Sequence, residues 1–151
     1  MAGVYNLADG PLHDEHDREG WRFRATRVAD EIGAERIGGS VYELAEGERT
    51  FPYHYHHGVE EWLVVLGGTP TVRTPDGTRA LQAGDVVCFA SGAGGAHGVT
   101  GPGRFLMLSA GARPSIAVYP DSDKLGARPA DDNDRLTFRR SSAVDYWDGE
   151  E

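Results

Sequence analysis

The chain has 151 residues, a net charge of −9, and 26% charged and 39% hydrophobic residues. This size and composition are typical of one globular domain with a single core. An acidic surface repels phosphate backbones and anionic lipids, so we expect no nucleic-acid partner and no membrane partner. No apolar stretch is long enough to span a bilayer, and residues 1–20 do not resemble a signal peptide. We therefore expect a cytoplasmic protein.

Short apolar runs separated by turn residues extend from Val41 to Tyr119. The turns recur about every eight to twelve residues and include Pro75-Asp76-Gly77, which predicts a hairpin. No helical period is evident in this region, so the pattern predicts an all-β sandwich or barrel. We expect residues 1–40 to form an N-terminal arm and residues 41–119 the barrel. Residues 120–151 form an acidic C-terminal tail, which we expect to pack on the barrel or on a partner.

Two runs inside the predicted barrel carry local expectations. Residues 49–57 are rich in aromatic and β-branched residues and predict a strand, in which Pro52 indicates an edge or a bulge. Residues 61–66 are apolar on both faces, which predicts burial on both faces and a packing role for Trp62. The single cysteine, Cys88, lies in another apolar run and is expected in the core.

Three histidines and a carboxylate have the spacing of a metal site. His54 and His56 are two apart on a predicted strand, so their side chains share a face and that of His57 lies opposite. A carboxylate follows on the next run, and His97 comes after a glycine-rich loop. Three imidazoles and a carboxylate suit a divalent transition metal such as Zn, Fe, Mn or Ni. Strand parity does not decide between the adjacent carboxylates Glu60 and Glu61.

The spacing Gly47-x6-His54-x-His56-x4-Glu61-x6-Gly68 resembles the first motif of the cupin superfamily. The stretch from Gly84-Asp85 through Gly92 to His97 resembles the second, with Ala90 in place of a usual proline and Gly101 in place of a frequent asparagine. The resemblance implies a double-stranded β-helix, the cupin jelly-roll barrel. It implies that the metal ligands are His54, His56, Glu61 and His97, because the family pattern aligns Glu61 rather than Glu60 with the ligand position.

The long second-motif loop and residues 119–123 resemble small bacterial cupins often described as sugar-phosphate isomerase-like. This resemblance implies a metalloenzyme that acts on a small, sugar-like substrate by isomerase-like or dioxygenase chemistry. The alternatives are a non-catalytic cupin that binds metal and a small ligand, as a sensor or carrier, and a metal that only stabilises the barrel. We also expect a homodimer, because aromatic residues outside the barrel need burial, namely Trp21, Phe23, Phe138 and Trp147.

Overall fold

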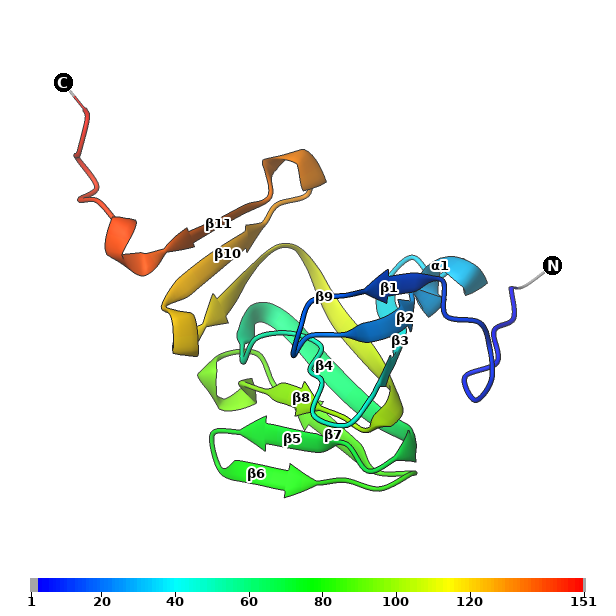
Figure 1. The fold of residues 1–151 in the computed structure, drawn as a ribbon. Coiled ribbons are helices and arrows are strands. Elements are labelled where there is room, and N and C mark those ends of the chain that lie inside the picture. The colour runs from blue at the N-terminus through cyan, green and yellow to red at the C-terminus, as the bar shows by residue number, and fades with distance from the viewer. Residues whose placement is uncertain (1–2, 151) are drawn as a thin grey trace.

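The computed structural model describes residues 3–150, and antiparallel strands make up most of its regular secondary structure (Figure 1). The strands are β1 (Asp14–His16), β2 (Phe23–Thr26), β3 (Ile37–Leu44), β4 (Tyr55–Gly68), β5 (Thr71–Thr74), β6 (Gly77–Ala80), β7 (Val86–Phe89), β8 (Gly98–Thr100), β9 (Gly103–Tyr119), β10 (Lys124–Arg128) and β11 (Leu136–Arg139). One short α-helix, α1 (Val28–Ile32), and the 3-10 turns η1 (Ala93–Gly95), η2 (Pro120–Ser122), η3 (Asp132–Asp134) and η4 (Arg140–Ser142) complete the described chain. The predicted all-β fold is confirmed.

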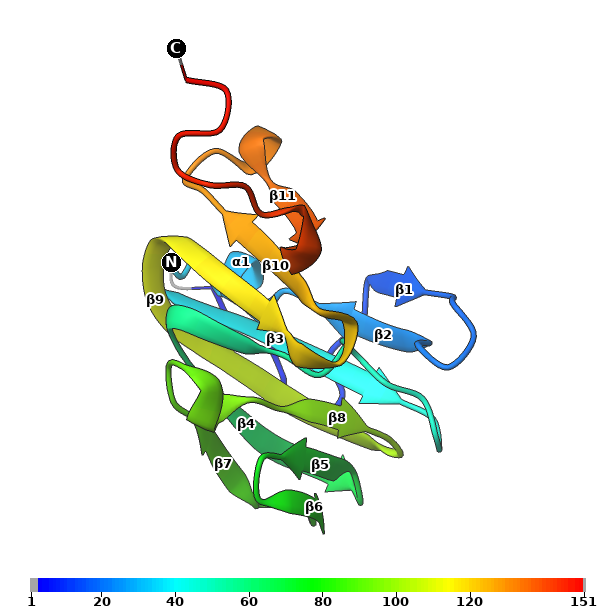
Figure 2. The ribbon, with the colours of Figure 1, turned by 90° about the vertical axis from the view of Figure 1, so that its left-hand side faces the viewer.

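The long strand β9 organises the larger sheet. On one side β9 pairs with β4 in both its first and its second half. On the other side its first half pairs with β3 and its second half with β10. β7 adds to β4, while β5 pairs with β6 and β8 in a separate three-stranded sheet. Figure 2 shows β5, β6 and β8 lying against one side of the larger sheet. Residues far apart in sequence therefore meet inside one barrel.

The larger sheet is apolar on both faces. Its inner face meets the smaller sheet around fully buried side chains such as Leu63 and Phe105. Its outer face is covered by the N-terminal arm and α1, where Val64 and Leu66 pack close to the buried Val41. This double coverage explains why β4 has no clear alternation of apolar and polar residues.

Three local expectations are wrong. Residues 50–54 form bends and a single bridge rather than a strand, because the proline at position 52 has no N–H to donate to a ladder. Cys88 is exposed, and Trp62 is 45% exposed, because both side chains point outward from the paired strands β4 and β7. The N-terminal arm and α1 cover the outer face at Val64 and Leu66, but this cover does not extend to Trp62 and Cys88.

The two ends of the chain extend the sheet beyond the predicted barrel. The arm contributes β2, which pairs with β3, and the tail contributes the β10–β11 hairpin, which continues from β9 (Figure 1). Beyond this hairpin, residues 140–150 are exposed. No helix in the described part of the chain is long and apolar enough to cross a membrane.

Candidate metal centre

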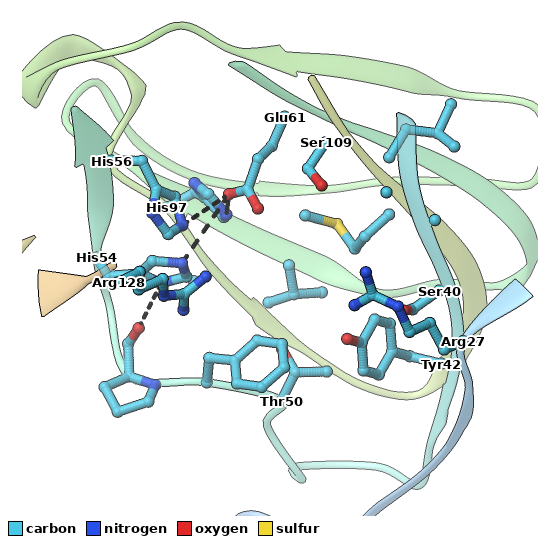
Figure 3. A pocket seen from close by; sticks show the side chains of 18 of the residues that line it. Arg27, Ser40, Tyr42, Thr50, His54, His56, Glu61, His97, Ser109 and Arg128 are labelled. Carbon is cyan, nitrogen blue, oxygen red and sulfur yellow. Dashed lines mark hydrogen bonds and ion pairs between the residues drawn. The ribbon is translucent and has the colours of Figure 1, made fainter. Parts of the chain in front are cut away.

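The structure brings His54, His56, Glu61 and His97 together inside the barrel (Figure 3). The Nε2 atoms of His56, His97 and His54 lie 3.3, 3.4 and 4.0 Å from Oε2 of Glu61. All three histidines are buried. Glu60 lies outside this cluster and accepts a hydrogen bond from Nε1 of Trp62 at 2.9 Å. His57 is exposed.

Backbone pairing places His54 beside His97. Each of the two residues donates its N–H to the other's carbonyl oxygen, at 3.0 and 2.8 Å, in an isolated bridge. Their ring centroids are consequently 4.7 Å apart. The ring of His97 also stacks on Phe89 at 3.8 Å, which fixes its plane.

An irregularity in β4 decides which carboxylate joins the cluster. Glu61 is five residues after His56, and an odd separation puts two side chains on opposite faces of a regular strand. The pairing of β4 with β9 changes register between His57 and Val59, and Gly58 between them has φ 78°. This left-handed conformation favours glycine. The change of face brings Glu61, rather than Glu60, to the side of His56.

The hydrogen bonds of the imidazoles direct their free nitrogens toward Glu61. Nδ1 of His54 lies 2.8 Å from the carbonyl oxygen of Pro52, and Nδ1 of His97 lies 2.9 Å from that of Gly95. A carbonyl oxygen only accepts, so each Nδ1 carries the proton and each neutral ring presents a lone pair at Nε2. These lone pairs face a carboxylate oxygen that has no hydrogen-bond partner among the described residues.

The pKa values of the cluster favour the charge states that a metal requires. Burial, reinforced by the neighbouring His97 and His56, lowers the pKa of His54 from 6.5 to about 4. Burial also lowers the pKa of His97. Burial by itself would raise the pKa of Glu61, but His56 and then the other imidazoles outweigh it and lower that pKa. At neutral pH His54 and His97 are therefore neutral, and Glu61 is a carboxylate.

The donor set could hold a divalent metal ion. Ligand atoms about 2.1 Å from one ion lie roughly 3.0–3.5 Å apart, close to the separations from Glu61. The ligand atoms of His54, His56 and Glu61 all lie within 4.8 Å of one another. A cation at their centre would satisfy the lone pairs and the unpartnered Oε2 together.

The cluster lies at one end of a cavity of about 190 Å³. Its other walls include Tyr42 and Ser40 from β3 and Ser109 from β9 (Figure 3). Tyr42 is half-buried, and burial raises the pKa of its hydroxyl, which therefore stays protonated at neutral pH. Ser40 and Ser109 lie outside the motifs around the histidines, and nothing in the sequence singled them out.

Two arginines from the chain ends also reach this cavity. Arg27 precedes α1 and Arg128 ends β10, and both line the same walls as the histidines. Neither was predicted as a site residue, because neither lies within the motifs around the histidines. Only the pairing of the arm and the tail with β3 and β9 brings them here.

Comparison with known proteins agrees with this architecture. Residues 40–110 match the family model for a cupin domain. Nearly half of the chain therefore matches a cupin domain, and the fold described above agrees with that match. No match was found among curated proteins.

Solved structures extend the similarity beyond the matched domain. A sugar phosphate isomerase of the cupin superfamily from Silicibacter pomeroyi has a TM-score of 0.74 and 22% identity, over 83% of this chain and 82% of that one. A protein from Acidithiobacillus ferrooxidans, provisionally named a sugar phosphate isomerase, has a TM-score of 0.73 and 22% identity, over 83% of this chain and 81% of that one. A cupin-like protein from Thermotoga maritima has a TM-score of 0.54 and 18% identity, over 70% and 84%. Identities this low establish the shared fold alone.

Proposed function

We propose that this cupin is a metal-dependent enzyme that acts on a small, sugar-like substrate, with isomerase-like chemistry ahead of dioxygenation. His54, His56, Glu61 and His97 would hold the metal. The observation that carries the proposal is the cluster of unprotonated nitrogens around an unpartnered carboxylate oxygen, at the end of a cavity that also contains a protonated tyrosine. A divalent ion bound there would act as a Lewis acid toward a substrate oxygen.

The protein's own residues would hold the ligands in place and supply a proton donor. The carbonyl oxygens of Pro52 and Gly95 keep the protons of His54 and His97 on Nδ1. This arrangement leaves Nε2 free and fixes the direction of each ring. The hydroxyl of Tyr42 faces the same cavity and keeps its proton at neutral pH, so it can donate to an oxygen of a bound substrate.

The size of the cavity limits the substrate. Pockets that enclose drug-sized ligands have volumes of roughly 300–1,000 Å³, and about 190 Å³ is available here. A molecule with a short carbon chain fits this volume, whereas a nucleotide does not. The names of the two most similar solved structures above add support for a sugar phosphate or a related small molecule.

The proposal is tested by metal analysis of protein purified without added metal, followed by a substrate screen with the metal found. The screen would pair aldose and ketose phosphates and would measure oxygen uptake separately. We expect wild type and His57→Ala to retain metal and turnover, and His56→Ala to lose both. Metal binding without turnover of any substrate would favour the non-catalytic sensor or carrier. Absence of metal in wild type would contradict the proposal.

We also propose that the chain forms a homodimer. Exposed apolar side chains gather on the β10–β11 hairpin and the segment that follows it, where Leu136, Phe138 and Trp147 are 63%, 42% and 70% exposed. Burial of such side chains against a second copy would stabilise the assembly. Light scattering that gives the mass of a monomer at micromolar concentration would contradict this part of the proposal.

A further inference from the structure

The cavity beside the histidine cluster has a charge opposite to that of the whole protein. The chain carries a net charge of −9, yet the cavity is lined by two guanidinium groups, Arg27 and Arg128, and by one carboxylate, Glu61. That carboxylate belongs to the proposed metal ligands. Once it is engaged with a cation, no other carboxylate among the described residues of the cavity balances the two arginines.

Arg128 is the less compensated of the two arginines. It is half-buried at the end of β10, and it has no hydrogen bond or ion pair among the described side chains. A partly buried charge without a partner is unfavourable, so an anion bound beside it would be stabilising. Arg27 is more exposed, and its Nε donates to Asp30 at 2.9 Å. Asp30 is not among the residues that line the cavity, so its ion pair with Arg27 holds that side chain without adding a carboxylate to the cavity wall.

The approach to the cavity is also basic. An adjoining open pocket shares Arg27, Arg128 and Glu61 with the cavity. It adds to its rim Arg36, Arg113 and one carboxylate, Glu35, so that arginines outnumber carboxylates among its lining residues. Figure 3 shows the side chain of Arg27 reaching toward the cavity beside Tyr42 and Ser40. Burial raises the pKa of Tyr42 and the charges of both guanidinium groups oppose this rise, which agrees with their place in the walls of the same cavity. Such a rim attracts anions from solution.

We propose that Arg27 and Arg128 bind the anionic group of the substrate, a phosphate or a carboxylate, while the rest of the molecule reaches the cluster of His54, His56, Glu61 and His97. The inference rests on the proposed function, since it assigns the substrate to the same cavity. Both arginines lie outside residues 40–110, the part that matches the cupin domain. The arm and the tail would thus determine which substrates the common barrel accepts.

The test compares three probes with the same carbon skeleton: glycerol 3-phosphate, glycerate and glycerol. Their binding to the metal-loaded full chain is measured by calorimetry at low ionic strength. We expect at least one of the two anions to bind and glycerol not to bind. Binding of glycerol 3-phosphate alone would assign a phosphate, and binding of glycerate alone a carboxylate. If neither anion binds more tightly than glycerol, the proposal is overturned.

Matched variants assign the binding to the two arginines. We expect Arg128→Gln and Arg27→Gln each to weaken anion binding by about tenfold or more, because each removes charge-assisted hydrogen bonds. Arg79→Gln on the exposed strand β6 removes the same charge far from the cavity and should bind as wild type does. Arg128→Lys keeps the charge and should bind more tightly than Arg128→Gln, which separates a lost anion contact from a damaged fold.

Metal content, measured on the same samples, separates this inference from the proposed function. If metal is present but Arg128→Gln and Arg27→Gln bind the anions as wild type does, the anion site is refuted and the metal centre stands. If wild type contains no metal but binds anions through these arginines, the metal-dependent function is refuted and the anion site stands.

Discussion

Acid should destabilise the metal-free protein through His54. The pKa of this imidazole is 6.5 in an unfolded chain and about 4 in the folded protein. The unfolded chain therefore binds the proton more tightly, and the free energy of unfolding falls as the pH falls from 6.5 to 4. The stability is fully present above pH 6.5. This lowering of the pKa of His54 corresponds to a loss of about 3 kcal/mol in the free energy of unfolding. That is a large part of the roughly 5–15 kcal/mol that stabilises a typical domain.

Two neighbours act in the same direction. Burial lowers the pKa of His97, so its protonation also favours unfolding below pH 6.5. The pKa of Glu61 is lowered from 4.5, so the stability that its carboxylate contributes is lost below about pH 4.5. The loss between pH 6.5 and 4 should therefore be at least as large as that from His54 alone.

Urea unfolding of chelator-treated protein at pH 7, 6, 5 and 4 measures this effect. His54→Gln should reduce the pH dependence, while His57→Gln, at an exposed position, should retain that of wild type. A free energy of unfolding that is constant from pH 6.5 to 4 would refute the reasoning. So would an unchanged pH dependence in His54→Gln.

Three further outcomes are expected. A chelator should lower the melting temperature of metal-loaded wild type and His57→Ala by about 10 °C and leave that of His56→Ala nearly unchanged. The reason is that loss of a ligand present at a thousandfold excess over Kd costs about 4 kcal/mol of stability. A chelator response in His56→Ala but not in His57→Ala would contradict the assigned strand face. Gly95→Ala should lower stability by roughly 1–3 kcal/mol and reduce metal content, because its new Cβ would overlap the backbone carbonyl oxygen of Ala90. The control is Gly94→Ala, whose Cβ would enter open space and which should melt as wild type does. Leu63→Ala, at a fully buried position, should cost about 2–5 kcal/mol in urea unfolding, and a loss below 1 kcal/mol would show that this site is not part of a packed core.

The sequence alone predicted the fold class and the four residues of the cluster. Turn signals at short intervals are local, and so is the period of two that places His54 and His56 on one face. The family resemblance decided for Glu61 over Glu60. Burial of residues 61–66 on both faces was also readable, although Trp62 is an exception, because the cover of the arm and α1 over Val64 and Leu66 does not extend to it.

Only the tertiary structure decided how the remaining residues meet. A regular strand would place Glu60 beside His56, and the register change at Gly58, which depends on the pairing of β4 with β9, brings Glu61 there instead. Arg27 and Arg128 are separated by about a hundred residues in sequence, and both line one cavity because the arm and the tail add strands to the same sheet. Contacts of this kind depend on pairings between distant strands, and local patterns in the sequence do not encode those pairings.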